Sequence, residues 1–384
     1  METKLLRELC VEIVDCPHST PSWTSAGKIV IRNFNIQHGK IDFSNPSFTD
    51  QEHYLHRIKR AKPEGGDLVI TREAPMGQVG MIPSNVECCL GQRMVLLKVD
   101  RTVCNPYYLL YALQSPAVQF QIKCNEGTGT TVSNLRIPIL EHLEIPFVNK
   151  ENQDRIAAFL KLIDDKIEIN NKIIKNVTEQ INLLFSYYSS KSGSSRVSLT
   201  EIIDVKGGGT PNTQTPEYWS GGIPFFTPKD ANALFVTETD KTISKVGLEN
   251  CNSRLYEKGT VFVTARGTVG KIAIAGKSMA MNQSCYALIG DGIGQELAYF
   301  YAKSAISSLK NKANGAVFDA IVTRDFKSES IIRMASSLEA DFEKKAKLYF
   351  DEILTLQNQN MALNELRDSL LPRLISGEID LKNL

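Results

Sequence analysis

The chain has 384 residues, 42% of them hydrophobic, and its 44 basic and 43 acidic residues leave a formal net charge of +1. This length is typical of two or three domains, and the near-neutral charge excludes a general affinity for polyanions, so any nucleic-acid surface must be a local patch. No apolar run approaches the roughly 18 residues that span a bilayer, and the first residues contain no apolar signal core. We therefore expect a cytoplasmic protein without membrane contact. The eight cysteines form no C-x-x-C pair, which favours free thiols over metal binding.

Residues 1–150 predict a globular lobe of mixed strands and short helices, because Val- and Ile-rich runs alternate with Gly, Pro and Asn. The strongest strand is GDLVITR at residues 66–72, and it leads into GQVGMI at residues 77–82. We expect Gly77 to serve a turn that needs a positive φ or a close backbone approach. Residues 107–112, YYLLYA, predict a short helix.

Residues 151–190 differ from the lobe, because they contain neither proline nor glycine and their apolar residues recur in steps of four and three. This pattern predicts one long helix with a heptad seam, interrupted once by an asparagine. Its seam positions are Ile156, Leu160, Ile163, Ile167, Asn170, Ile174, Val177, Ile181, Leu184 and Tyr188. Off the seam, Phe159, Ile169, Ile173 and Phe185 predict a further exposed protein-binding surface.

A flexible Ser/Gly linker at residues 191–196 leads to a second lobe at residues 197–335, which repeats the first. GTVFVTAR at residues 259–266 and GKIAI at residues 270–274 match the earlier motifs at a common offset of 193 residues. The helical run 107–112 has its counterpart at residues 297–302, and glycine loops follow at residues 127–129 and 314–315. Such a long repeat is a duplicated domain rather than a solenoid unit.

Residues 336–384 predict a second long helix and a C-terminal tail. At an offset of 186 the seam repeats as Phe342, Ala346, Tyr349, Ile353, Leu356, Asn360, Leu363, Arg367, Leu370 and Leu374. We expect the two helices to pair as an antiparallel coiled coil that separates the lobes, with Asn170 and Asn360 fixing its register. The alternative is that each helix only caps the core of its own lobe. The predicted fold class is therefore α+β, with two similar lobes, each followed by a long helix.

This order of lobe, helix, lobe and helix resembles the specificity subunit of type I restriction–modification systems over essentially the whole chain. The resemblance is carried by the repeated motifs at residues 66–82 and 259–274. It is also carried by GGGTP with EYWSGGIP in the second lobe, and by LLPRLISGEI near the C-terminus. The resemblance implies two target-recognition domains on double-stranded DNA and spacer helices that dock two modification subunits. It also implies restriction subunits as partners. The chain itself is then not an enzyme and binds no cofactor, since S-adenosylmethionine, ATP and Mg²⁺ belong to the partners.

Polar side chains at matching strand ends are the candidates for DNA contact, because Arg, Asn and Gln read bases while Arg, Lys and Thr hold phosphates. The DNA-binding candidates are Arg32, Asn33, Arg72, Gln92 and Arg93 in the first lobe, and Thr227, Lys229, Arg266, Lys271 and Gln283 in the second. The alternative for Arg72 and Arg266 is a solvated position or an intramolecular ion pair. The lobes open differently, with DCPHSTP in the first and KGGGTP in the second, which predicts an asymmetric target.

Three further patterns suggest chemistry that we do not expect. IAGKS at residues 274–278 lacks the earlier glycine of a phosphate-binding loop. Asn105-Pro106 resembles part of a methyltransferase base-binding loop, but a helix cap is the simpler interpretation. His53 and His56 could share a helical face and bind a metal, yet we expect them on a surface helix. A rival function is a coiled-coil scaffold for two protein partners that does not bind DNA.

Overall fold

The computed structural model describes residues 2–124, 134–191, 193–312 and 320–379. The predicted glycine loops at residues 127–129 and 314–315 lie outside these ranges. The chain divides into two compact units, one formed by Met1–Lys166 with Ala362–Leu384 and the other by Ile167–Met361. Each unit contains one lobe and a part of each long helix.

The first unit is built around an antiparallel sheet in which the strand that follows Gly66 is central and fully buried. The order of this sheet is β2 (Cys10–Asp15), β10 (Met94–Val99), β7 (Leu68–Thr71) and β8 (Val79–Met81). A second sheet contains β6 (Ser47–Thr49), β3 (Lys28–Ile31) and β9 (Cys88–Leu90), with β3 and β9 parallel. The remaining pairs are β1 (Thr3–Leu5) with β11 (Glu144–Pro146), and β4 (Ile36–Gln37) with β5 (Lys40–Ile41).

Short helices cover these sheets. They are α1 (Gln51–Arg57), α2 (Pro106–Gln114), α3 (Pro116–Cys124) and α4 (Ile137–Glu141), with 3-10 turns at Leu6–Glu8 and Asn33–Asn35. The predicted cap of α2 is confirmed, because the Asn105 side chain accepts hydrogen bonds from the amides of Tyr107 and Tyr108. Pro106 occupies the first helical position, where its missing N–H costs nothing.

The second unit repeats this topology. Its main sheet has the order β13 (Ile203–Gly207), β20 (Cys285–Gly290), β17 (Val261–Thr264), β18 (Ile272–Ala275) and β15 (Phe235–Val236). The second sheet contains β16 (Thr242–Ile243), β14 (Trp219–Phe226) and β19 (Ala280–Met281), and β12 (Ser195–Ser198) pairs with β21 (Ser330–Arg333). Its helices are α6 (Lys245–Glu249), α7 (Gln295–Lys312) and α8 (Thr323–Ser328), with 3-10 turns at Leu199–Glu201 and Pro216–Tyr218. The duplication is confirmed, down to the parallel pair β14 and β19, and β15 is a fifth strand that the main sheet of the first unit lacks within the described residues.

A buried threonine closes the same hairpin in both lobes. The Thr71 hydroxyl donates to the carbonyl of Pro75 at 2.6 Å and accepts from the amide of Gln78 at 2.9 Å. Thr264 donates to the carbonyl of Thr268 and accepts from the amide of Lys271 at 3.0 Å. The glycines before the return strands, at positions 77 and 270, have φ values of +79° and +75°, which confirms the predicted need for glycine.

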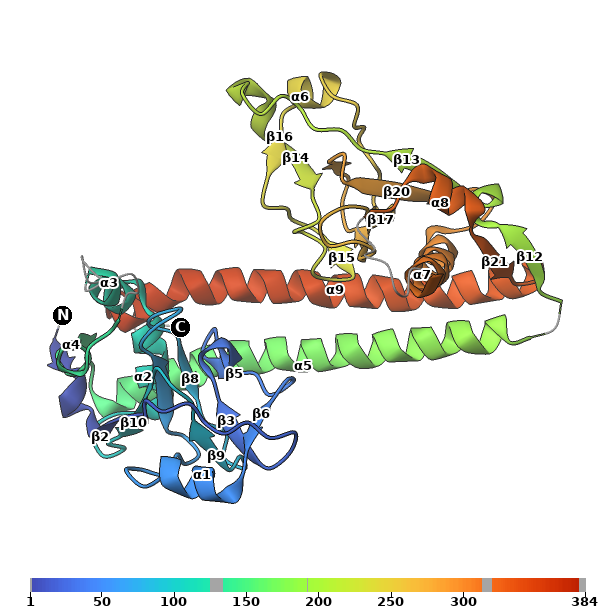
Figure 1. Ribbon diagram of the computed structural model, residues 1–384. Coiled ribbons are helices and arrows are strands. Elements are labelled where there is room, and N and C mark those ends of the chain that lie inside the picture. Colours follow the sequence, from blue (N-terminus) through green and yellow to red (C-terminus); the bar gives the residue numbers. More distant parts are fainter. Residues whose placement is uncertain (1, 125–133, 192, 313–319, 380–384) are drawn as a thin grey trace. The chain divides into compact units, whose positions relative to one another are not determined.

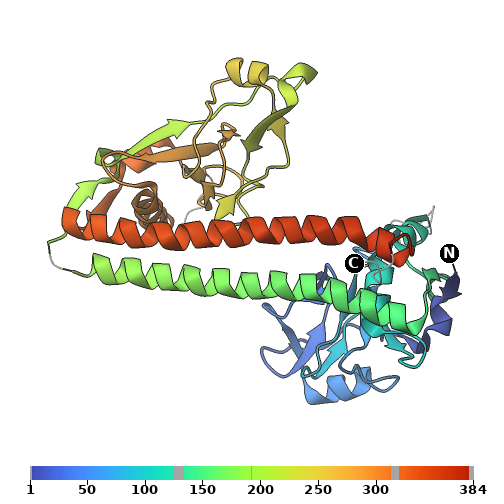
Figure 2. The ribbon, with the colours of Figure 1, turned by 180° about the vertical axis from the view of Figure 1, so that it is seen from behind.

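The two long helices, α5 (Lys150–Ser189) and α9 (Ser336–Ile375), have 40 residues each and run in opposite directions within each unit (Figures 1 and 2). In the first unit, Leu160 of α5 shares a core with Leu374 of α9. In the second unit, Tyr188 of α5 packs on Phe342 of α9, with ring centroids 5.9 Å apart. Every predicted seam position is buried or half-buried. The antiparallel pairing is therefore confirmed, and the helices do more than cap their lobes.

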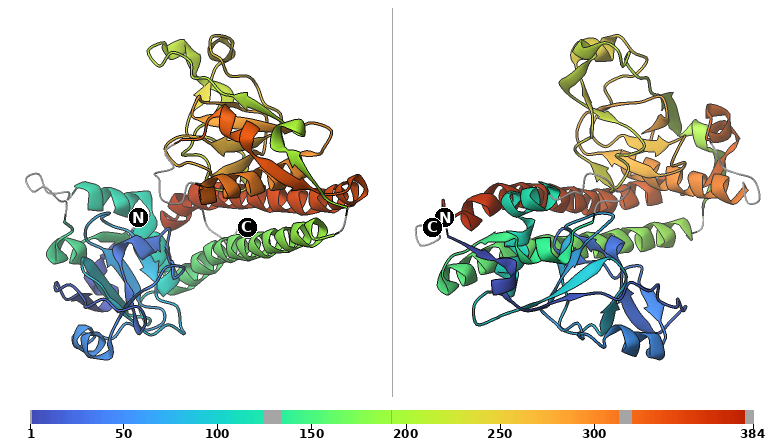
Figure 3. Two further views of the ribbon diagram at one scale, coloured as in Figure 1. Left: turned by 45° about the vertical axis from the view of Figure 1, so that its right-hand side comes forward. Right: turned by 60° about the vertical axis from the view of Figure 1, so that its left-hand side comes forward.

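The predicted off-seam surface is largely wrong. Phe185 stacks on Phe300 of α7 with ring centroids 4.6 Å apart, and Phe159 and Ile173 pack against the cores of their own units. Helix α7 contacts both the sheet and α9, as can be followed in Figure 3. Only Ile169 of the four predicted residues is exposed, because the other three fill space between the helix and its lobe.

Candidate nucleic-acid interface

The five candidates of the first lobe meet at one edge of its sheets. Arg32 and Asn33 follow β3, Arg72 follows β7, and Gln92 and Arg93 link β9 to β10. These strand ends lie together because β3 is parallel to β9 and β7 is antiparallel to β10. The side-chain amide of Asn33 donates to the carbonyl of Ala74 at 2.6 Å, and the backbone amide of Arg72 donates to the carbonyl of Arg93 at 2.8 Å. The structure thus brings these side chains into one loop cluster.

Two arginines of this edge are engaged by carboxylates. Nη1 of Arg72 lies 2.9 Å from Asp15, and its other nitrogens donate to the Leu135 carbonyl and the Asn134 side chain. Only 11% of the Arg72 side chain is exposed, so the alternative of an intramolecular ion pair describes its position. Arg93 is more exposed, with its Nε 3.2 Å from Glu73. Neither arginine presents an uncompensated charge.

Arg32 is placed differently. Its guanidinium carbon lies 4.8 Å from the ring centroid of Trp23 and 4.6 Å from that of Phe34. Both rings are 46% exposed, so the group is a cation between two solvent-facing aromatic side chains. The sequence did not single out either aromatic residue, because an isolated Trp or Phe in a loop carries no periodic signal.

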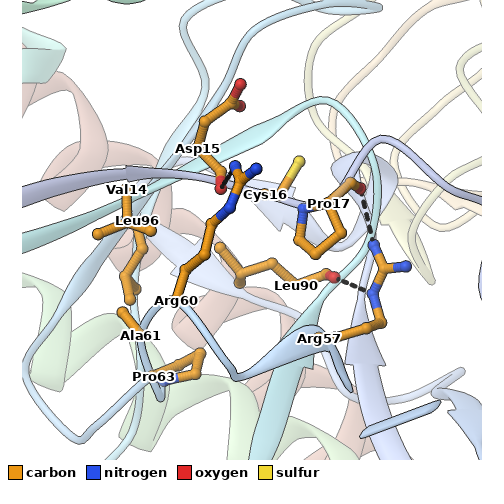
Figure 4. Close-up of a pocket in the computed structure, with 10 residues that line it drawn as sticks. All are labelled: Val14, Asp15, Cys16, Pro17, Arg57, Arg60, Ala61, Pro63, Leu90 and Leu96. Carbon is orange, nitrogen blue, oxygen red and sulfur yellow. Dashed lines mark hydrogen bonds between the residues drawn. The ribbon is translucent and has the colours of Figure 1, made fainter. Parts of the chain in front are cut away.

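The loop that opens the first lobe is held by a buried arginine that sequence reasoning missed. Arg57 of α1 donates to the carbonyls of Leu90 and Pro17 at 2.7 and 3.1 Å, as Figure 4 shows, and to that of Ser19 at 2.9 Å. Burial lowers the pKa of the Arg57 guanidinium and raises the pKa of the neighbouring Cys16 thiol. The amide of Gln92 also donates to this loop, at the His18 carbonyl. Gln92 is half-buried and therefore supports the loop at the surface of the lobe.

The second lobe arranges its candidates at the corresponding edge. The amide and hydroxyl of Thr227 both donate to Asp230 at 2.7 Å, so this side chain closes a turn. Gln283 accepts from the hydroxyl of Thr210, as Gln92 contacts Thr20 in the first lobe. Both glutamines contact the opening loop of their lobe, Gln92 as a donor and Gln283 as an acceptor.

Three basic candidates of the second lobe, Lys229, Arg266 and Lys271, are exposed. Their side chains form no ion pair or hydrogen bond with any part of the chain that the structure describes. The free cations of this edge contrast with the paired arginines of the first lobe.

The structural equivalent of Arg72 is Ala265, not the candidate Arg266. The Ala265 amide donates to the carbonyl of Ser284, and its own carbonyl accepts from Ile321. Arg72 makes the same two backbone bonds, with Arg93 and Leu135. The sequence comparison hid this one-residue shift, because an arginine follows each strand in both motifs, ITR at residues 70–72 and VTAR at residues 263–266.

The opening loop of the second lobe is shaped by glycine rather than by an arginine. A Cβ atom on Gly208 would lie 2.2 Å from the carbonyl oxygen of Asn282, and one on Gly209 would lie 2.7 Å from the amide of Asn252. Any side chain at these positions would force the backbone apart. The two lobes therefore hold equivalent loops by different means.

The structure places the other sequence patterns in ordinary surroundings. Residues 274–278 are the end of β18 and a bend, without a helix N-terminus. His53 lies in α1, 2.7 Å from Asp50 and 3.0 Å from the Ser22 hydroxyl. Within the described ranges, no three His, Cys, Asp or Glu side chains gather as metal ligands, and no helix has the length and apolarity to cross a bilayer.

Comparison with known proteins agrees with this arrangement. The sequence model of the family described as "Type I restriction modification DNA specificity domain" matches residues 24–179 and again residues 191–332. Over 175 residues the chain is 31% identical to the type I restriction enzyme MjaIX specificity subunit of Methanocaldococcus jannaschii, a match that covers 44% of this chain. Over 186 residues it is 29% identical to the HindI specificity subunit of Haemophilus influenzae, covering 47% of this chain. The chain spans 40% of the length of each relative.

A solved structure shows the same fold. The S subunit of a type I restriction–modification system from M. genitalium superposes with a TM-score of 0.63 at 17% identity. The superposition covers 97% of this chain and 95% of that one. Since the family model matches both lobes and most of the sequence, the chain belongs to the family of type I restriction–modification DNA specificity proteins.

Proposed function

We propose that this chain is the DNA-recognition subunit of a type I restriction–modification complex and that each lobe reads one half of a bipartite target. The observation that carries the proposal is the duplication itself. The family match recurs in both lobes, and each lobe gathers polar and basic side chains at the same sheet edge.

The target is asymmetric in this proposal, because the two edges differ chemically. The first presents Arg32 between aromatic rings, whereas the second presents Lys229, Arg266 and Lys271 without ion-pair partners in the described chain. Different side chains at equivalent positions select different bases. A palindromic target would require the same readers twice.

The paired helices set the distance between the half-sites and dock two modification subunits, with restriction subunits completing the assembly. The continuous 40-residue length of α5 and α9, and their antiparallel pairing within each unit, support this role. In this proposal the chain is not catalytic and works in the cytoplasm. S-adenosylmethionine, ATP and Mg²⁺ act in the partner subunits.

Methylation-site mapping tests the function directly. The full chain is co-expressed with its modification subunits in a methylation-free host, and modified positions are mapped across the genome. We expect one asymmetric sequence with two short specified parts and an unspecified spacer. Co-purification with protein partners but random or absent methylation would instead favour a scaffold that does not read DNA.

A second experiment tests the role of the helices. Insertion of one heptad into both α5 and α9 lengthens the pair by about 10 Å, close to the rise of about 3 base pairs. The mapped spacer should lengthen while the two specified parts stay the same. An unchanged spacer in an active complex would refute the idea that the helices act as a ruler.

A further inference from the structure

Arg32 lies in a loop, yet both its main chain and its guanidinium are held in place. Its guanidinium lies within 5 Å of two ring centroids, at 4.8 Å from Trp23 and 4.6 Å from Phe34. Its backbone amide donates to the Asn35 side chain at 2.9 Å, and the neighbouring Asn33 is bonded to the carbonyl of Ala74. The main chain and the planar head are therefore both restrained before any ligand arrives.

The donors of this guanidinium are unused. In the described ranges the Arg32 side chain has no hydrogen-bond or ion-pair partner, whereas Arg72 and Arg93 at the same edge are paired with Asp15 and Glu73. Aromatic rings hold the faces of a guanidinium and leave its N–H edges open. Arg32 thus combines a fixed plane with free donors.

We infer that Arg32 determines a guanine in the half-site of the first lobe, and this inference rests on the proposed function. Guanine presents O6 and N7 side by side in the major groove, and the arginine fork donates to both. The orientation provided by Trp23 and Phe34 favours this bidentate contact, because less side-chain freedom is lost on binding. A phosphate contact needs only charge and would gain little from such a clamp.

The test uses the complete complex with its modification subunits and duplexes that carry its mapped target. Each guanine of the half-site read by the first lobe is replaced in turn by 7-deazaguanine, which lacks the N7 acceptor. With the native complex, one replacement should weaken binding about 10- to 100-fold. Arg32→Lys should weaken binding to the unmodified target and become less sensitive to that replacement, because a lysine ammonium lacks the planar fork that donates to O6 and N7 together.

Two further variants separate specificity from folding. Arg101→Lys changes an arginine that follows the far end of β10 and donates to the Gly65 carbonyl, so it should keep the native pattern. The double variant Trp23→Leu with Phe34→Leu retains the charge of Arg32 but removes its clamp, and it should reduce the discrimination at the same guanine. Thermal melting checks that each variant folds.

Several outcomes would overturn the inference. These are equal binding of all 7-deazaguanine duplexes, a half-site without guanine, or an Arg32→Lys variant that binds as the native protein does. An Arg32→Lys variant that binds every sequence equally less tightly, while keeping the native response to each 7-deazaguanine, would assign Arg32 to a phosphate instead. Failure of the proposed function is distinguishable, because the native complex would then not separate its target from a scrambled duplex.

Discussion

Replacing the asparagine pair of the helix seam should make the protein more stable, although each single replacement should weaken it. Nδ2 of Asn170 lies 2.9 Å from Oδ1 of Asn360, whose own amide donates to Asn171 at 2.8 Å. Asn170 is completely buried, and its Oδ1 has no hydrogen-bond partner in the described structure. A polar layer of this kind specifies register at a cost in stability.

The magnitudes follow from these contacts. Asn360→Leu alone leaves the buried amide of Asn170 without its best acceptor, which costs about 1–3 kcal/mol. Changing both residues to leucine removes the unsatisfied polar groups and buries two apolar side chains, so we expect a net gain of about 1–3 kcal/mol. In a unit of this size each kcal/mol shifts Tm by about 2–4 °C.

Thermal melting of the full chain, followed by circular dichroism, measures both effects. Asn176→Leu is the matched control, because Asn176 lies on the exposed face of α5 and the same substitution there should change stability by less than about 0.5 kcal/mol. A double variant that melts below the native protein, without a change in oligomeric state, would refute the reasoning. The asparagines would then stabilise the seam instead of only specifying its register.

Other predictions follow from single contacts. Lys271→Ala should reduce the slope of log Kobs against log salt by about 0.9 in filter binding, whereas Arg93→Ala should change it less because Glu73 already compensates that charge. Phe185→Ala removes the ring stacked at 4.6 Å on Phe300 and should cost about 3–5 kcal/mol in urea denaturation; a loss below 1 kcal/mol would contradict the packing. Arg57→Met should lower the free energy of unfolding by about 2 kcal/mol, because buried carbonyls lose their donor. In methylation assays with targets altered in one half-site at a time, the variant should discriminate less well at the first half-site only. An equal loss of discrimination at both half-sites would argue against a local role.

The parts of the fold that depend on local patterns could be predicted from the sequence. Thr71 and Thr264 stand in repeated strand–turn motifs whose hydrogen bonds close within eight residues, so similar letters predict the same hairpin. The helix seam could be predicted equally well, because a heptad repeat determines which side chains face the partner helix. Asn170 and Asn360 meet as their matching positions in the two seams predict.

The candidate site was harder to predict from the sequence, because its chemistry depends on contacts between distant residues. Arg72 was a DNA candidate by type and position, but its partner Asp15 lies 57 residues earlier. Arg57 reaches carbonyls about 40 residues away, and no side-chain pattern marks a carbonyl acceptor. The aromatic neighbours of Arg32 are likewise set by loop conformation. Residue type predicted which side chains could bind DNA, while the fold decides which remain free to do so.

The self-contained hairpins around Thr71 and Thr264 have an evolutionary consequence. Their turns are closed by hydrogen bonds within residues 71–78 and 264–271, so loops elsewhere in each lobe can change without breaking these bonds. Each lobe can therefore change its recognition residues while the other lobe keeps its own. A single gene built this way can generate hybrid recognition by recombining halves rather than by redesigning either.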